Sequence, residues 1–307
     1  MFLELKNTTV GYKTPLIKGI ETGLALGEIG LLIGNNGVGK TTLIKSILNQ
    51  TPLLSGDILL EGKSVKTLSN KETAKKIAVV FSKSQIPANY TVTDLVAFGK
   101  YIHYPYYFEL NDADKHEVDH LIESLNLTQY RDFPLQKLSD GNLQKAFIGR
   151  ALAQNSPMII LDEPTTHLDE ENKIIILKLL RKLAKTQHKL ILFSSHDWRL
   201  SKEFADKIWL VNEGALDAGI TEDILLKHDE LLNPKIFHFN DGFIPPHIIA
   251  PILEKEMLYS FLQKNTSKNL SSLKFEFKDG IWLISGHNFQ QKCVSFNEVS
   301  DLIANIG

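Results

Sequence analysis

The sequence has little cysteine, no long apolar run and no excess of basic residues. A single cysteine, Cys293, occurs in 307 residues, so an internal disulfide is excluded and nothing indicates an oxidising compartment. Apolar runs such as Met158–Leu161 are far shorter than the roughly 18–20 residues that a membrane-spanning helix needs. Met1–Thr9 has neither a basic start nor a long apolar stretch, so no signal peptide is expected. The 34 Lys and Arg are balanced by 36 Asp and Glu, which argues against a nucleic-acid scaffold.

Strand-like apolar runs alternate with helical patterns through the first 228 residues, as in α/β folds. The expected buried strands are Glu28–Gly34, Ile77–Phe81, Met158–Leu161, Leu190–Phe193 and Lys207–Val211. The expected helices are Thr41–Asn49, His116–Leu127, Asn142–Gln154 and Asn172–Lys185. The pattern changes near 230–240, so we predict one large domain over residues 1–235 and a C-terminal extension over residues 236–307.

The C-terminal extension has structural signals of its own. Pro245-Pro246 interrupts any regular element, and a helix is expected over Pro251–Gln263. Asp279-Gly280 favours a tight turn in a hairpin over Leu273–Ile284. Ser295-Phe296-Asn297-Glu298 matches a capping box that precedes a last helix. We therefore predict a small α+β unit. It either adds packing only, or it stabilises the dimer or tunes activity.

A glycine-rich segment between a predicted strand and a predicted helix fits the pattern G-x-x-x-x-G-K-[ST]. Its residues are Gly34, Asn35, Asn36, Gly37, Val38, Gly39, Lys40, Thr41 and Thr42. Glycines let the backbone curl so that successive N–H groups point at phosphate oxygens, and the helix that follows adds its positive dipole end. Lys40 can reach the β/γ-phosphates, and the Thr41 hydroxyl can ligate Mg²⁺. The segment predicts a nucleotide phosphate site.

Two carboxylates follow the predicted strand Met158–Leu161 at its C-terminal end, where ligands bind in open α/β sheets. Asp162 suits a Mg²⁺ role, and Glu163 is placed to polarise an attacking water as general base. A second strand ends just before His196, and Leu138-Ser139-Asp140-Gly141-Asn142 precedes a helix about 20 residues before the acidic pair. The order of these elements along the chain argues against His196 being merely a surface residue.

With these motifs, the sequence over roughly residues 2–228 resembles the ATP-binding cassette (ABC) ATPase family. The glycine-rich segment matches the Walker A motif, and Met158–Glu163 matches Walker B with its catalytic glutamate. The resemblance implies that His196 is the switch histidine, that Tyr12 stacks on adenine and that Thr166–Asp169 is the D-loop, which places Asp169 at the nucleotide. It also implies the fold: a P-loop NTPase core of the RecA type, an antiparallel β subdomain and a helical subdomain.

Two positions depart from the family pattern. The signature, usually L-S-G-G-Q, contains Ser139, Asp140, Gly141 and Asn142 here, so a negative charge replaces a glycine and the glutamine is shortened. The hydroxyl and the small backbone needed near a γ-phosphate are kept, and turnover could be slower. The expected Q-loop glutamine position holds Ser82. Either its hydroxyl substitutes at Mg²⁺, or the loop presents Gln85 instead; spacing favours Ser82.

In the family, the signature of one cassette completes the nucleotide site of another, which implies an isologous dimer of two copies of this chain around ATP and Mg²⁺. Thr91–Lys100 and Asp162–Asp169 are similar to segments in ATPases of iron-siderophore, haem and cobalamin importers. That similarity implies partnership with transmembrane permease subunits, indirectly with a substrate-binding protein and not with nucleic acid. It implies a peripheral location on the cytoplasmic face of the inner (plasma) membrane. The alternatives are a soluble ATPase of the iron–sulfur assembly type and a nucleotide-gated interaction module.

Overall fold

The structure is a computed structural model of the 307-residue chain, and it describes residues 1–82, 89–105, 109–166, 168–195, 198–228, 243–287 and 289–305. Two compact units divide the chain, Met1–Ile224 and Leu225–Gly307. The predicted boundary between residues 235 and 236 lies outside the described residues and stays a prediction. None of the helices in the described ranges combines the length and the apolar character that crossing a membrane requires.

A six-stranded sheet forms the centre of the first unit, with the strand order β10-β9-β3-β8-β7-β6. Its strands are β3 (Ile29–Ile33), β6 (Ile77–Val80), β7 (Met158–Leu161), β8 (Leu190–Ser195), β9 (Lys207–Asn212) and β10 (Ala215–Ile220). All neighbours are parallel except β10, which is antiparallel to β9. Every residue of β3, β7 and β8 is buried, which explains their continuous apolar runs. Because β8 lies between β3 and β7, the carboxyl ends of these three strands meet at one edge of the sheet.

An antiparallel sheet with the order β2-β1-β4-β5 packs beside the central one. Its strands are β1 (Leu3–Gly11), β2 (Pro15–Leu24), β4 (Ser55–Leu60) and β5 (Lys63–Ser64). Helix α1 (Lys40–Ile47) buries Leu43, Ile44 and Ile47 in a core that takes side chains from both sheets. The packing of both sheets against α1 therefore fixes the helix that begins at the glycine-rich loop.

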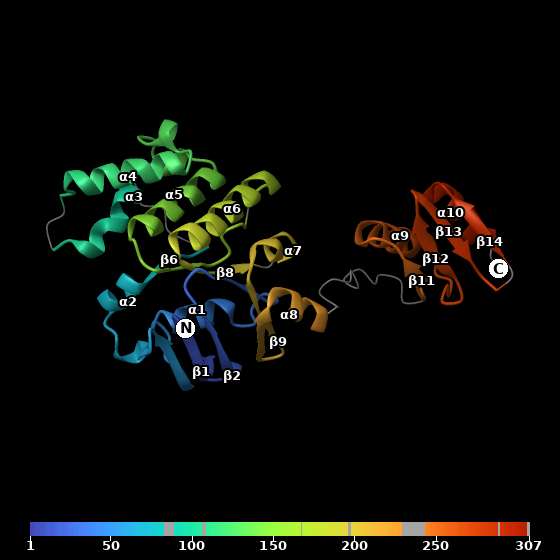
Figure 1. Ribbon diagram of the computed structural model, residues 1–307, viewed down its shortest axis with the longest axis horizontal. Coiled ribbons are helices and arrows are strands. Elements are labelled where there is room, and N and C mark those ends of the chain that lie inside the picture. Colours follow the sequence, from blue (N-terminus) through green and yellow to red (C-terminus); the bar gives the residue numbers. More distant parts are fainter. Residues whose placement is uncertain are drawn as a thin grey trace. The chain divides into compact units, whose positions relative to one another are not determined.

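The remaining helices of the first unit include a separate group. Helices α3 (Val92–Phe98), α4 (Asp112–Ser124) and α5 (Asp140–Ala153) pack on one another at the end of the unit opposite β1 and β2 (Figure 1). The other helices are α2 (Asn70–Lys76), α6 (Glu170–Gln187), α7 (Trp198–Ser201) and α8 (Thr221–Lys227), the last of which extends into the second unit. The described part of the first unit also has five short 3-10 turns: Val65–Thr67, Gly99–His103, Thr128–Tyr130, Leu135–Lys137 and Lys202–Phe204.

Two ion-pair clusters fix helices to the first unit. Buried Lys100 pairs with Asp114 at 3.0 Å and with Glu117, which joins the turn after α3 to α4. Burial alone would lower the Lys100 pKa, but the two carboxylates raise it. Asp206, just before β9, accepts from the Ile29 N–H at 2.9 Å and from two cations of α6. The end of α6 is thereby tied to the start of β3.

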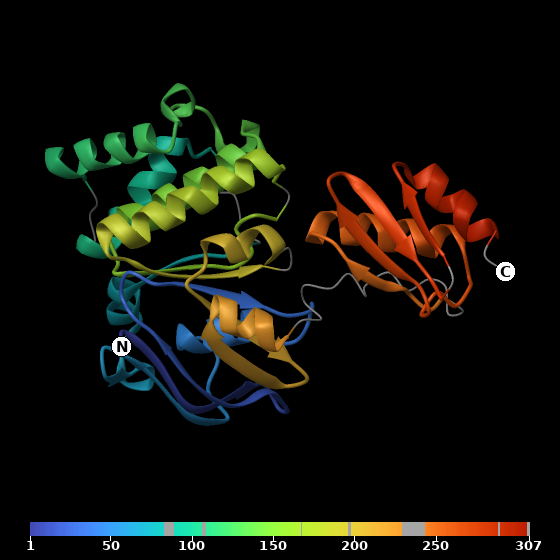
Figure 2. The ribbon, with the colours of Figure 1, turned by 45° about the vertical axis from the view of Figure 1, so that its right-hand side comes forward.

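The second unit is a four-stranded sheet with two helices on one face (Figure 2). Its elements are β11 (His247–Ile249), α9 (Ile252–Asn265), β12 (Lys274–Lys278), β13 (Ile281–Ser285), β14 (Gln290–Cys293) and α10 (Phe296–Asn305). β11 runs parallel to β12, and the other pairs are antiparallel. Phe275, Trp282 and Ile284 of the sheet pack with side chains of α9 and α10 in one core. The predicted small α+β unit is confirmed by this arrangement.

The predicted hairpin of the second unit is confirmed, and the predicted capping box is half formed. Asp279 and Gly280 have φ of 51° and 78°, as a two-residue hairpin turn requires. The Glu298 N–H donates to Ser295 Oγ at 3.3 Å, as expected. The Glu298 carboxylate, however, accepts from the N–H of Val294 at 2.9 Å, one residue earlier than a capping box requires. That hydrogen bond ties the end of β14 to α10.

Candidate functional site

The glycine-rich loop joins β3 to α1 in a conformation that side chains would block. Gly34 and Gly39 have φ of 150° and 113°, values that favour glycine. A Cβ on Gly34 would lie only 2.6 Å from the carbonyl oxygen of Val211. No side chain caps the first turn of α1, and that turn contains no acidic residue. Its N–H groups and its positive dipole end are therefore available to an anion.

Lys40, the first residue of α1, folds back beneath this loop. Its Nζ donates to the carbonyl oxygens of Gly34 at 2.7 Å and of Asn35 at 3.1 Å, and the residue is only 6% exposed. Burial lowers the Lys40 pKa, while the nearby carboxylates of Glu163 and Asp162 act in the opposite direction. The ammonium thus lies between the loop backbone and the acidic pair, where it can neutralise phosphate charge.

Asp162 connects the two halves of the site. The Thr41 hydroxyl donates to Asp162 Oδ2 at 3.0 Å, and the Ser194 hydroxyl donates to Asp162 Oδ1 at 2.7 Å. The Asp162 N–H donates to the carbonyl oxygen of Val80, the last residue of β6. With 4% exposure, this carboxylate is buried and held on both oxygens. Thr41 and Asp162, which the sequence proposes for Mg²⁺, are brought together.

Glu163 follows in a backbone conformation that is uncommon for a residue with a side chain. Its φ is 54°, in the left-handed region. Its N–H donates to Ser194 Oγ at 2.9 Å, and its carboxylate accepts from the Thr166 hydroxyl at 3.2 Å. The turn at Glu163 takes the chain out of the sheet and places the carboxylate beside Lys40 and Asp162 at the same sheet edge. This position is consistent with the predicted general base.

The signature residues lie at the start of α5. Ser139 is the N-cap and accepts from the Asn142 N–H at 3.4 Å, with Asp140 exposed in the first turn. Gly141 is buried, and a Cβ there would approach the Asn172 side chain at 3.2 Å. Asn172 in turn donates to Asp169, the N-cap of α6. The structure therefore joins the signature segment to the predicted D-loop through the first turns of two helices.

The remaining predicted site residues are peripheral or lie outside the described part. Tyr12 is 63% exposed in the turn between β1 and β2, so its ring is accessible to a flat ligand. Ser82 is exposed two residues after β6. His196 and Gln85 lie outside the described residues, so their predicted roles and the choice between Ser82 and Gln85 stay predictions.

Ser194 is a residue that the sequence analysis missed. It is fully buried in β8 and hydrogen-bonds both to Asp162 and to the backbone of Glu163. The one signal that could have indicated it is a hydroxyl near the carboxyl end of an otherwise apolar strand, Leu190–Ser195, next to two motif strands. The sequence does not show that Asp162 and Glu163 are its partners, because this depends on the order of the strands in the sheet.

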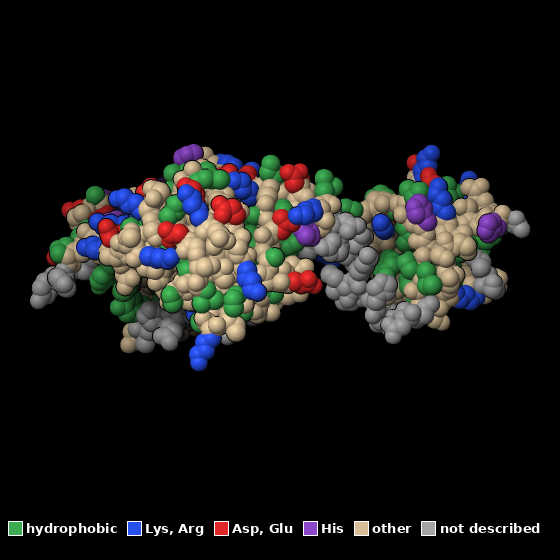
Figure 3. Space-filling view, turned by 90° about the horizontal axis from the view of Figure 1, so that it is seen from below, with side chains coloured by type: hydrophobic (Ala, Val, Ile, Leu, Met, Phe, Trp, Pro, Cys, Tyr) green, Lys and Arg blue, Asp and Glu red, His purple; other side chains and the backbone are tan. Residues whose placement is uncertain are grey.

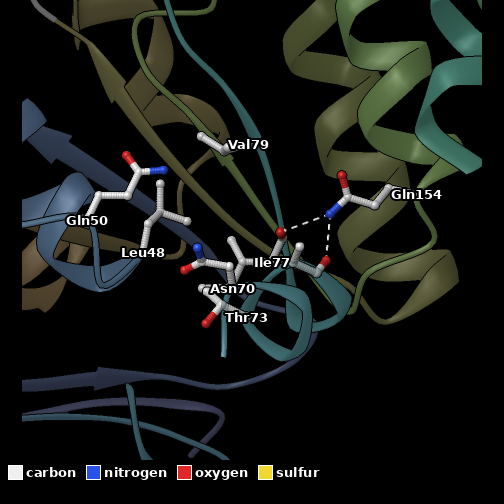
Figure 4. A pocket seen from close by; sticks show the side chains of 8 residues that line it. Leu48, Gln50, Asn70, Thr73, Ile77, Val79 and Gln154 are labelled. Atoms are coloured by element: carbon white, nitrogen blue, oxygen red, sulfur yellow. Dashed lines mark hydrogen bonds between the residues drawn. The ribbon is translucent and has the colours of Figure 1, made fainter. Parts of the chain in front are cut away.

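A pocket of about 320 Å³ lies in the first unit away from these residues (Figure 4). Its lining residues are Leu48, Gln50, Asn70, Thr73, Ala74, Ile77, Val79 and Gln154. Gln154 donates to the carbonyl oxygens of Ala74 and Ile77, which leaves a mainly apolar surface. The buried Thr73 hydroxyl has no hydrogen-bond partner among the described residues. The sequence analysis gave no indication of this pocket.

Charged side chains are mixed on the face shown in Figure 3. Lys and Arg side chains alternate with Asp and Glu over the visible part of the first unit, so that face has no broad area of one sign. The net charge of −2 agrees with this distribution. Binding to the phosphate backbone of a nucleic acid depends on a broad basic surface, and the face shown in Figure 3 does not have one.

Comparisons with known proteins identify the class of this site. A family model described as ABC transporter matches residues 17–166. The petrobactin import ATP-binding protein FpuD of Bacillus anthracis is 32% identical over 76% of this chain and 86% of its own length. The iron(3+)-hydroxamate import ATP-binding protein FhuC of Bacillus subtilis is 32% identical over 73% of this chain and 86% of its own. The structure of cbiO1 from Clostridium perfringens, part of the ABC transporter complex cbiONQ, matches with a TM-score of 0.66 at 25% identity, over 75% and 92% of the two chains.

The chain belongs to the ABC transporter family, as an ATP-binding subunit whose activity is that of an ABC transporter ATPase. The predicted α/β ABC cassette with a C-terminal α+β extension is confirmed, and so is the resemblance to the ATP-binding proteins of iron-siderophore importers. An ABC transporter ATPase binds ATP.

Proposed function

We propose that this chain drives the import of an iron chelate of the siderophore type, and that two copies of it work on one permease. The observation that carries the proposal is the likeness, over about three quarters of the chain, to proteins named for petrobactin and iron(3+)-hydroxamate import. Lys40, Asp162 and Glu163 lie close together within one copy of the chain. This arrangement supports the part of the proposal that concerns ATP hydrolysis. Haem and cobalamin are the other substrate classes that the sequence resemblance suggests.

In this proposal the residues of one copy hold the nucleotide and prepare the water. Tyr12 stacks on adenine, and the backbone of residues 34–42 cradles the phosphates, with the Lys40 ammonium on the β- and γ-phosphate oxygens. Glu163 accepts a proton from the attacking water, and His196 acts with it on that water. The left-handed turn at Glu163 and its hydrogen bond from Thr166 support this role because they fix the direction of the carboxylate.

The donor set beside the loop fits Mg²⁺. Thr41 Oγ1 and Asp162 Oδ2 are 3.0 Å apart, and hydroxyl and carboxylate oxygens are ligands that this ion prefers. Ser82 would add a third oxygen from the end of β6. When bound, Mg²⁺ supplies positive charge against the phosphates, while Thr41 and Asp162 orient it and Lys40 shares the neutralisation.

A second copy completes each nucleotide site in this proposal. Ser139, Asp140, Gly141 and Asn142 of one chain contact the γ-phosphate bound by the other, and Asp169 lies at the same junction. The support is the exposure of Ser139 and Asp140 at the N-terminus of α5, where the positive end of the helix dipole lies. Contacts that exist only with a γ-phosphate would couple ATP binding to dimer closure.

The pocket lined by Leu48, Thr73 and Ala74 is a place where a permease segment could dock. Its apolar walls suit an aliphatic or aromatic side chain of that segment. Ala74→Phe would fill the pocket. This variant should lose co-purification with the permease while the separate cassette keeps its ATPase activity.

Uptake in cells tests the proposal as a whole. Cells without this chain should fail to accumulate a radiolabelled ferric siderophore, and the wild-type chain should restore uptake while Glu163→Gln should not. Glu170→Gln, which changes an exposed glutamate at the start of α6, is the matched control and should restore uptake. Unchanged siderophore uptake without the chain contradicts the substrate class. Purification free of any polytopic membrane protein would favour the soluble assembly ATPase.

A further inference from the structure

Ser194 makes two hydrogen bonds, one to each residue of the acidic pair. It is the penultimate residue of β8, the strand that lies between the phosphate-loop strand β3 and the acidic strand β7. Its Oγ accepts from the N–H of Glu163 at 2.9 Å, and its hydroxyl donates to Asp162 Oδ1 at 2.7 Å. Ser194 is completely buried, so no water competes for either bond.

The direction of both hydrogen bonds is determined by chemistry. A backbone N–H can only donate, so Ser194 Oγ must be the acceptor from Glu163. A serine hydroxyl has one proton, and a carboxylate oxygen is a strong acceptor for it. One hydroxyl therefore satisfies both neighbours, and no apolar side chain of the same size can satisfy either.

Each of the two hydrogen bonds restrains the orientation of one group that takes part in the proposed hydrolysis. Thr41 already donates to Asp162 Oδ2, so the bond from Ser194 to Oδ1 fixes the rotation of the carboxylate plane. Glu163 is in the left-handed region, which residues with a side chain rarely adopt without support from their surroundings. The bond to its N–H supports that turn and so the direction in which the side chain leaves the sheet.

We propose that Ser194 is a positioning residue for ATP hydrolysis, which orients Asp162 toward Mg²⁺ and Glu163 toward the attacking water through these two hydrogen bonds. The inference rests on the proposed roles of Asp162 and Glu163. Ser194 is fully buried, and its only proton is donated to Asp162, so we assign it a role through these two residues and not on the nucleotide or the water.

The variants Ser194→Ala, Ser194→Cys and Ser194→Thr test this role. Loss of a charge-assisted hydrogen bond at a buried carboxylate should lower kcat by about tenfold in the Ala and Cys variants, with the KM for ATP changed little. Threonine keeps a hydroxyl donor and acceptor, so it should recover most of the rate. Cysteine has nearly the size of serine but is a weak hydrogen-bond donor. If the alanine variant folds poorly, the cysteine variant therefore still tests whether the hydrogen bonds of Ser194 matter.

A second readout does not depend on turnover. Thermal stabilisation by ADP is followed while Mg²⁺ is titrated, and the half-maximal Mg²⁺ concentration should rise severalfold in the Ala and Cys variants. Ser46→Ala is the matched control, because Ser46 is equally buried in α1 and its hydroxyl has no hydrogen-bond partner among the described residues. This control should keep the wild-type kcat and the wild-type Mg²⁺ midpoint.

The possible outcomes separate this inference from the proposed function. Wild-type kcat and Mg²⁺ midpoint in both Ser194→Ala and Ser194→Cys overturn the positioning role, as does a lowered melting temperature with both readouts unchanged. A Glu163→Gln variant that hydrolyses ATP as fast as wild type overturns the proposed general base instead. In that case the Mg²⁺ midpoint still decides whether Ser194 acts on Asp162.

Discussion

Thr41 and Asp162 are 121 residues apart in the sequence and are joined by a hydrogen bond of 3.0 Å. The first is exposed at the start of α1, and the second is buried after β7. The protein thus links its phosphate loop to its acidic strand end directly. A substitution in the phosphate loop should therefore also disturb Asp162, and a substitution at Asp162 should also disturb Thr41.

Replacing the proposed general base should separate hydrolysis from binding. In Glu163→Gln the backbone N–H still donates to Ser194, so the turn is retained while the proton acceptor is lost. We expect kcat to fall by about 100-fold or more, with ATP-dependent dimers that persist in size-exclusion chromatography. The exposed change Glu170→Gln should leave both properties as in wild type. Rapid turnover by the Glu163→Gln chain would falsify the assignment.

The signature departure at Asp140 should slow turnover through its charge. Asp140 is exposed in the first turn of α5, so in a dimer its carboxylate would repel the γ-phosphate of the partner's nucleotide. Asp140→Asn keeps the shape and removes the charge, and we expect it to raise kcat by about two- to fivefold at low salt. The difference should shrink as ionic strength rises. Asp140→Gly restores the family residue, but it also removes an acidic residue from the helix start, which costs about 0.5–1 kcal/mol.

The loss of folding stability at acidic pH should depend on Asp206. Burial alone would raise its pKa, but Arg181, the Ile29 N–H and Lys185 together lower it in the folded chain. A depressed carboxylate pKa contributes stability above the unfolded value of about 3.9, and this stability is lost as the pH falls toward the folded value. Asp206→Asn should therefore be less stable than wild type at neutral pH, and this difference should shrink as the pH falls below the unfolded value of about 3.9. Urea unfolding at several pH values measures this.

The control for that titration is Asp132→Asn, an exposed carboxylate in a turn between α4 and α5. It should follow the wild-type curve across the whole pH range. A constant gap between wild type and Asp206→Asn down to pH 2 would contradict the role given to the Arg181 and Lys185 pairs.

The two compact units should unfold separately. Phe275 is fully buried in the core of the second unit, and truncation of such a ring costs about 3–5 kcal/mol. In Phe275→Ala we expect one calorimetric transition to move to lower temperature, while the transition of the first unit and the ATP-binding affinity stay unchanged. Phe98→Ala, an exposed ring in α3, is the matched control for the loss of a phenyl group and should shift neither transition strongly. A single transition that moves as a whole would contradict independent folding.

The sequence predicts best those elements whose residues are buried on both faces. Strand β7 has the predicted bounds Met158–Leu161, because a continuous apolar run between turn signals leaves few alternatives. Helix ends are less well predicted. Helix α5 begins at Asp140 rather than Asn142 because Ser139 caps it, and α4 begins at Asp112 rather than His116 because Asn111 does so.

What could not be predicted depends on contacts between distant segments. Ser194 acquires its partners only because β8 lies between β3 and β7, an order that periodicity does not contain. β11 and β14 were missed because three or four partly polar residues at a sheet edge give no alternation to detect. The Walker residues can be proposed from the sequence because their chemistry requires a fixed spacing along the chain, which is visible without knowledge of the fold.

The single cysteine gives this chain a practical property. Cys293 is buried in the second unit, and burial together with the Glu298 carboxylate raises the pKa of its thiol, so the reactive thiolate is scarce at neutral pH. A cysteine introduced at an exposed position would therefore carry almost all of the thiol reactivity. Asn36→Cys combined with Asp140→Cys would place one such thiol on the phosphate loop and one on the signature. A disulfide between two chains would then record head-to-tail pairing without prior removal of the native cysteine.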